Sequence, residues 1–138
     1  MVFIGALAPD AVVLRRKLME SNNSAVADAL NKAIKEKEFA KIEDECNVIK
    51  ENMDKVLDFF PTGSLSENSR AKPEIWAKWG EFSKHPDNVK KAAQELAAAA
   101  KGGDEEAVKV KFKALGQACK GCHDSFRLPK PKMGEVFR

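Results

Sequence analysis

The stretch from residue 39 to residue 60 reads FAKIEDECNVIKENMDKVLDFF, and its apolar side chains recur at steps of three and four. They are Phe39, Ile42, Cys46, Ile49, Met53, Val56 and Phe60. Side chains at this spacing share one face of an α-helix, whereas a half-buried strand would need a step of two. A narrow apolar stripe of this kind is the seam along which a helix packs against other helices. The stretch therefore predicts a long amphipathic helix within a bundle.

The segments on either side carry the same kind of pattern. In the first segment, Val12, Met19, Val26 and Ala33 recur every seven residues. The third seam comprises Ile75, Trp79, Phe82, Val89, Ala93, Leu96 and Ala100, and the fourth comprises Val108, Phe112, Leu115, Cys119, Cys122 and Phe126. Pro86 fills the one skipped place in the third seam. The chain therefore predicts four helices that share one core.

Short polar segments separate the four seams. Asp10 suits the start of the first helix, and the glycines at 102–103 end the third before Asp104 opens the fourth. Residues 35–38 form a short polar link, whereas residues 61–73 form the single long connection. Short, long and short connections between four amphipathic helices predict an all-α fold, an antiparallel up-down-up-down four-helix bundle with one long crossover loop.

Two segments interrupt the helical pattern and leave alternatives open. Pro86 removes a helical hydrogen bond and clashes with the preceding turn, so it predicts a kink in the third helix. Residues 85–88 are equally consistent with a break followed by a new helix start. Residues 21–24, Ser-Asn-Asn-Ser, are poor helix formers in the middle of the first helix. They predict either a break or a small polar wall beside a flat cofactor.

Length and composition limit the class of protein. A chain of 138 residues with 33% charged and 43% apolar residues is a single globular domain. We assign the bundle to residues 10–127, an apolar arm or signal-peptide remnant to residues 1–9, and a basic tail to residues 128–138. A formal charge of +3 is too small for a nucleic-acid partner, and no apolar run approaches the length needed for stable membrane insertion.

The fourth segment contains the pentapeptide Cys119-Lys120-Gly121-Cys122-His123. Two thiols three positions apart, followed by an imidazole, are the attachment pattern for a c-type haem. Both thiols lie on one helix face, and His123 can serve as the proximal ligand of the iron. A redox dithiol or a zinc site is the alternative. A zinc site needs four ligands, but Cys46 and His85 lie far away in the sequence.

These residues resemble the class II c-type cytochromes, the cytochrome c′ family. The most specific stretch is 115–127, LGQACKGCHDSFR, in which a Leu-Gly pair precedes the haem motif and an aromatic-Arg pair follows it. Residues 59–61 and 72–76 resemble the crossover loop of the family and the start of its third helix. The resemblance implies one covalently attached haem c. No acid/base pair or substrate pocket can be read from the sequence, so we expect no enzymatic activity. Phe126 departs from the pattern because many members have tyrosine there.

The resemblance also assigns roles to two arginines. Arg127 lies four residues after His123, and by resemblance it screens the proximal side of the haem. Arg15 lies on the inner stripe of the first helix, where a charge is costly unless it is paired. By resemblance its partner is a haem propionate.

The resemblance places Met19 over the iron, four residues after Arg15. A thioether there either coordinates the iron, as in low-spin electron carriers, or packs as an apolar lid and leaves a vacant site. The segment Lys-Leu-Met with an asparagine soon after is similar to the low-spin members. We therefore expect Met19 as distal ligand and an electron carrier as the function. The alternative is a five-coordinate, high-spin protein that binds nitric oxide or carbon monoxide.

The resemblance extends to location and partners. It implies a bacterial periplasmic protein that exchanges electrons with redox partner proteins. Members of the family often pair through their first two helices, so a homodimer is a further expectation. The corresponding faces here are strongly charged, and a sedimentation experiment that gave a monomer at micromolar concentration would exclude the dimer.

Overall fold

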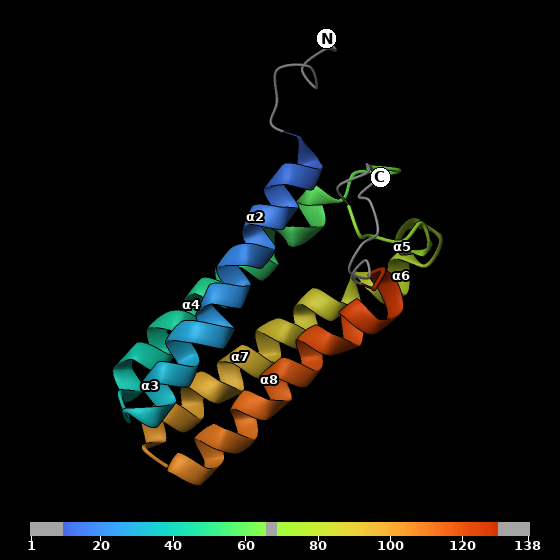
Figure 1. Ribbon diagram of the computed structural model, residues 1–138. Coiled ribbons are helices and arrows are strands. Elements are labelled where there is room, and N and C mark those ends of the chain that lie inside the picture. The colour runs from blue at the N-terminus through green and yellow to red at the C-terminus, as the bar shows by residue number, and fades with distance from the viewer. Residues whose placement is uncertain (1–9, 66–68, 130–138) are drawn as a thin grey trace.

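A computed structural model describes residues 10–65 and 69–129 of the chain (Figure 1). The helical elements are α2 (Ala11–Asn23), the π-helix η1 (Ser24–Leu30), α3 (Asn31–Lys35), α4 (Phe39–Lys55), the 3₁₀-helix η2 (Val56–Phe59), α5 (Glu74–Ala77), α6 (Trp79–Phe82), α7 (Lys84–Gly102) and α8 (Glu105–Phe126). No strand occurs in these ranges, where the only β-type pairing is an isolated antiparallel bridge between Ala71 and Arg127. The all-α prediction is confirmed.

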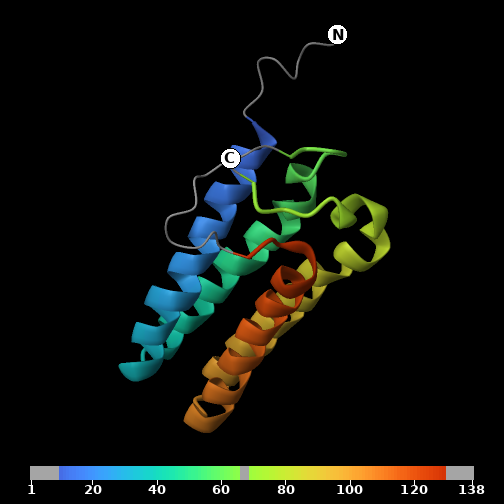
Figure 2. The same cartoon turned by 45° about the vertical axis from the view of Figure 1, so that its right-hand side comes forward.

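Four long helical stretches form the bundle: α2 with η1 and α3, α4 with η2, α7, and α8. Figures 1 and 2 show them as two pairs: the first comprises α2, with η1 and α3, beside α4, and the second comprises α7 beside α8. The two pairs meet where α4 packs against α7. Two contacts fix the register of the first pair, because Arg15 meets Phe59 and Asn22 meets Asn52. The partner number falls as the first number rises, so the two helices are antiparallel. The predicted antiparallel four-helix bundle is confirmed.

The core follows the predicted seams closely. Buried side chains occupy six of the seven predicted places between Phe39 and Phe60, five of them in α4 and η2 and the sixth at Phe60 directly after η2, while Phe39 is half-buried. The largest fully buried side chains of the other long helices include Leu30, Leu96, Val108 and Leu115. Trp79 is the exception, because 36% of it is exposed although it falls on the predicted third seam. Its place in the core is therefore a wrong prediction.

The first helix continues through residues 21–24 without a break. The chain changes from α-helix to π-helix at Ser24 and returns to α-helix at Asn31. The buried positions run through Arg15, Leu18, Asn22 and Ala25, and the next one, Leu30, follows at a step of five within the π-helix. Met19 and Val26, which the repeat placed in the core, are only half-buried. The predicted seven-residue repeat is therefore only partly correct.

One buried amide explains how this polar segment is held. Asn22 is buried, and its Oδ1 accepts a hydrogen bond of 2.8 Å from Nδ2 of Asn52 on α4. The same Nδ2 donates to the hydroxyl of Ser21 at 3.1 Å. The two poor helix formers thus gain partners across the helix pair, which offsets their weak helix propensity.

The third helix differs from the prediction of one kinked helix. Two short helices, α5 and α6, precede α7, which begins at Lys84. Pro86 therefore lies in the first turn of α7, where a missing N–H costs no helical hydrogen bond. The alternative of a break followed by a new helix start describes the structure better than a kink. His85, beside Pro86, is half-buried with its ring centroid 5.7 Å from that of Phe126.

The helix ends follow the predicted capping pattern. Oδ1 of Asp10 accepts from the amide of Val12 at 2.7 Å, and Oδ1 of Asp104 accepts from the amides of Glu106 and Ala107. Gly103 ends α7 with a φ of 73°, a left-handed conformation that favours glycine. Within the described residues, no helix is long and apolar enough to span a membrane. The predicted arm at residues 1–9 and most of the tail at 128–138 lie outside those residues.

Candidate functional site

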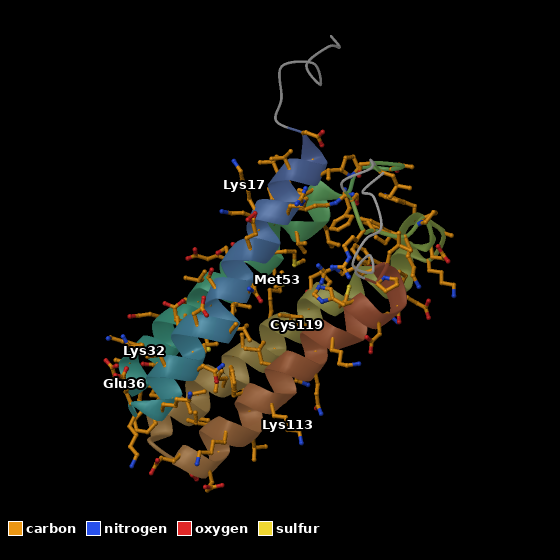
Figure 3. All side chains as sticks on the ribbon, in the orientation of Figure 1. Lys17, Lys32, Glu36, Met53, Lys113 and Cys119 are labelled. Atoms are coloured by element: carbon orange, nitrogen blue, oxygen red, sulfur yellow. The ribbon has the colours of Figure 1, made fainter. Side chains whose placement is uncertain are left out.

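The two cysteines of the predicted haem motif lie on one face of α8. Cys119 and Cys122 are half-buried, and both pack against the core of the bundle. Burial raises the pKa of each thiol, that of Cys122 to about 12 with a smaller contribution from Cys119. Figure 3 shows Cys119 of α8 and Met53 of α4 on the inner sides of their helices. Both thiols are therefore presented on the side of α8 that borders the core.

The remaining cysteine takes no part in this arrangement. Cys46 is fully buried on α4, and burial raises its pKa to about 12, so it is an inert core thiol. Among the described residues, no group of three or more His, Cys, Asp or Glu side chains is arranged to hold a metal ion. The cysteine pair is thus not part of a four-ligand zinc cluster within those ranges.

His123 follows the second cysteine and is half-buried near the end of α8. Burial lowers its pKa, and the positive charges of Arg127 and Arg70 lower it further, against a smaller opposing effect of Asp124. These effects favour the neutral imidazole, which is the form that coordinates a metal ion. The histidine therefore has the protonation state that an axial ligand requires.

Arg15 is buried, as its seam position predicted, with only 4% of its surface exposed. Its guanidinium donates to the carbonyl of Phe59 at 3.1 Å, to the hydroxyl and carbonyl of Ser64, and to the hydroxyl of Ser69 at 2.9 Å. Its Cζ also lies 4.4 Å from the ring centroid of Phe60. Burial lowers the pKa of Arg15, and the carboxylate of Asp10 opposes this. Arg15 thus anchors the crossover loop to α2.

The second half of the crossover loop is fixed to the end of α8. The amide of Lys72 donates to the carbonyl of Phe126 at 2.9 Å, and Ala71 pairs with Arg127 in the antiparallel bridge. The Leu128 amide donates to the carbonyl of Arg70, whose Nε donates to the carbonyl of Leu128 at 2.9 Å. We call residues 69–72 the strap. Through Arg15 and the strap, the loop links α2 to the end of α8.

Arg127 lies at the end of α8, as predicted, and its amide donates to the carbonyl of His123 at 3.1 Å. Burial and the charge of Arg70 lower the pKa of Arg127. Within residues 10–65 and 69–129, neither Arg70 nor Arg127 forms an ion pair with a carboxylate. The nearby carboxylate of Asp124 is paired with Lys120 at 2.7 Å.

Met19 lies half-buried on α2 and packs against the core. The first helix meets α8 only at the far end of the bundle, where α3 touches it, and α2 makes no comparable contact with α8. Figure 2 shows the same divergence of α2 from the end of α8. Met19 and the cysteine pair thus belong to the two helices that separate at this end.

The side chains at this end of the bundle have the chemistry that a c-type haem requires. Two thiols share one half-buried helix face, a neutral imidazole follows them, and a thioether lies on the diverging helix. The loop residues that complete this end were not predicted: Ser64, Ser69 and Arg70 meet Arg15 and residues 127–128 through contacts across more than forty positions. No local sequence signal marks such distant pairs. The residues present fit the group that the motif implies.

Comparison with known proteins agrees with this arrangement. A sequence model described as Cytochrome C′ matches residues 10–127, which is most of the chain. The chain belongs to the cytochrome c′ family. A cytochrome c′ of Rhodospirillum rubrum is 33% identical over 125 residues, which cover 88% of this chain and 85% of that protein. The family binds a covalently attached haem c, so the haem prediction is confirmed at the level of the family.

Solved structures of the family share the fold. The nitric oxide complex of a mutant cytochrome c prime from Alcaligenes xylosoxidans has a TM-score of 0.77 and 27% identity, covering 88% of this chain and 95% of that one. A carbon monoxide-bound variant of the same protein has a TM-score of 0.76 and 26% identity, covering 87% and 95%. In both structures a diatomic gas is bound to that cytochrome c prime.

Proposed function

We propose that this cytochrome c′ family member holds its haem through thioether bonds from Cys119 and Cys122, with His123 as proximal ligand. The common half-buried face of the two thiols supports this assignment. The pKa of the His123 side chain is lowered chiefly by burial, which favours the neutral ring and is consistent with this role. When bound, the haem supplies an iron centre that can change oxidation state or take a small axial ligand.

We further propose that the distal side of this haem takes a diatomic gas, nitric oxide or carbon monoxide. The observation that carries this function is the divergence of α2, which carries the half-buried Met19, from α8, which carries the cysteine pair. In this proposal Met19 packs as a soft apolar lid. Complexes of a cytochrome c prime with both gases support the proposal by analogy.

A second candidate function rests on the identity of Met19 itself. A thioether at this place is able to coordinate the iron, and a His/Met pair raises the reduction potential and suits electron transfer. The half-burial of Met19 on α2 is compatible with this role as well. The comparisons support gas binding better than Met19 ligation, so we treat the electron carrier as the alternative. Neither role requires an enzymatic step.

The visible and near-infrared spectra of the purified haem protein separate the two functions. Gas binding predicts a high-spin spectrum in both oxidation states, and new spectra when carbon monoxide or nitric oxide is added to the reduced protein. The electron carrier predicts a low-spin spectrum and a weak near-infrared band from sulfur-to-iron charge transfer. Met19→Ala is the matched variant: it should abolish that band if Met19 coordinates, and preserve gas binding if it does not.

The proposed setting is the bacterial periplasm, where redox partner proteins would reduce the haem. A homodimer through the first two helices belongs to the same proposal. The ion pair of Lys41 with Glu38 at 2.6 Å lies on this charged surface. Sedimentation at micromolar concentration decides the oligomeric state: a monomer would exclude the pairing.

A further inference from the structure

The end of the bundle that holds His123 also carries Arg70, a cation that the sequence analysis did not assign to the site. Arg70 belongs to the strap in the crossover loop, far from the haem motif in sequence. The hydrogen bonds of the strap place it beside the residues that follow His123. Its Nε donates to the carbonyl of Leu128, and its carbonyl accepts from the amide of Leu128. Two hydrogen bonds to one residue fix both the backbone and the guanidinium of Arg70.

The same short segment also fixes Arg127 against the proposed proximal ligand. The amide of Arg127 donates to the carbonyl of His123, and Arg127 pairs with Ala71, the neighbour of Arg70. Arg70 and Arg127 therefore lie on adjacent, hydrogen-bonded backbone segments one helical turn beyond His123. The burial of His123 limits the screening of these charges by water.

Arg70 and Arg127 both contribute positive charge at this end of the bundle. Within the described residues, neither arginine has a carboxylate in ion-pair contact, whereas Asp124 is already paired with Lys120. Arg127 lies one helical turn after His123, and its amide is hydrogen-bonded to the His123 carbonyl, while Arg70 is held on the backbone segment that pairs with Arg127. Positive charges placed beside a histidine ligand oppose the additional positive charge of ferric iron bound to it.

We propose that Arg70 is a second proximal cation that, together with Arg127, raises the reduction potential of the haem by acting through His123. Arg70 is a positioning and potential-setting residue and touches no reacting atom. The inference rests on His123 as proximal ligand, but it holds whether the distal side carries Met19 or a gas. It predicts that the charge of Arg70, more than its hydrogen bond to Leu128, determines the effect.

The test is the midpoint potential of the intact haem protein at low and at high ionic strength. Arg70→Gln should lower the potential, and Arg70→Glu should lower it about twice as far, because the change in charge is doubled. Both shifts should shrink as salt is added, since partly exposed charges are screened. Arg70→Lys keeps the charge but loses the planar fork, so it should retain most of the wild-type potential.

Lys113→Gln is the matched control, because it removes one positive charge, as Arg70→Gln does, but at a site farther from His123. Lys113 is exposed on α8 ten residues before His123, roughly 15 Å along the helix axis, and Figure 3 shows it on the outer side of the bundle. That separation exceeds the screening length of about 10 Å at 0.1 M salt. The control should therefore leave the potential unchanged at that ionic strength.

Two outcomes would overturn the inference. One is an unchanged potential in Arg70→Gln at low ionic strength. The other is an equal loss in Arg70→Lys and Arg70→Gln, which would assign the effect to the strap and not to the charge. A wild-type protein without covalent haem would instead contradict the proposed function, so the two failures are distinguishable.

Discussion

The two ends of the bundle are built from the same kind of helix but are packed differently. At the end where α3 meets α8, Leu30, Ala33 and Ile42 are almost fully buried. At the end that carries the haem motif, Met19, Cys119 and His123 are only half-buried, and the crossover loop takes the place of direct contact between α2 and α8. The comparison indicates that the closed end supplies stability, whereas the open end is shaped for a cofactor.

The largest effect is expected at the open end from removing both cysteines. The double variant Cys119→Ala with Cys122→Ala should lose covalent attachment completely, because no other described cysteine is available near His123. Acid-acetone should then extract any bound haem, while the wild-type haem should stay with the protein. Haem that resists extraction in the double variant would contradict the assignment of Cys119 and Cys122 as the attachment residues.

At the closed end, Leu96→Ala should cost stability without changing the haem spectrum. Leu96 is fully buried on α7, and truncation of such a side chain costs about 3 kcal/mol. Urea unfolding measures this loss as a lower midpoint with an unchanged slope. A loss below about 1 kcal/mol, or an altered haem spectrum, would contradict the division between the two ends.

Loss of the contacts between Arg15 and the crossover loop should have an intermediate effect on stability. Arg15→Leu removes the cation that binds Ser64 and Ser69, and it should destabilise the fold by about 2 kcal/mol, the scale of hydrogen bonds to a charged group. Hydrogen exchange should become faster in residues 59–65. If Arg15 also neutralises a haem propionate, the midpoint potential of Arg15→Leu should fall as well. Arg16→Leu, on the exposed side of α2, is the control and should change neither the stability nor the midpoint potential.

The smallest effect concerns a helix cap at the closed end. Asp104→Ala removes the acceptor for the amides of Glu106 and Ala107, which should cost about 1 kcal/mol of stability. The spectrum and the gas affinity should stay unchanged, because α8 begins far from its haem motif. A changed gas affinity would show that the closed end is not independent of the open one.

The sequence predicted the regular parts of the molecule well. The stripe from Ile42 to Phe60 is buried as expected, because helical periodicity alone decides which side of a long helix faces the core. The prediction erred for Trp79, whose segment breaks into the short helices α5 and α6 and no longer follows one seam. In the first helix the buried face runs through Leu18 and Asn22, not Met19, and the π-helix at Ser24–Leu30 adds a step of five between the buried Ala25 and Leu30.

The candidate site was predictable only where a local motif marks it. The cysteine pair and His123 are adjacent in sequence, so their chemistry could be inferred directly. The contacts of Arg15 with Ser64 and of Arg70 with Leu128 could not, because each joins residues that only the folded bundle brings together. A seam position showed that Arg15 is buried, but its partners depend on the path of the crossover loop.

The most direct test of the central claim is the intact mass of the full chain produced in cells that attach c-type haem. A haem held at the open end predicts a mass increased by one haem, with the modification on the peptide that contains Cys119 and Cys122. An unmodified mass with both thiols free to react would contradict the account.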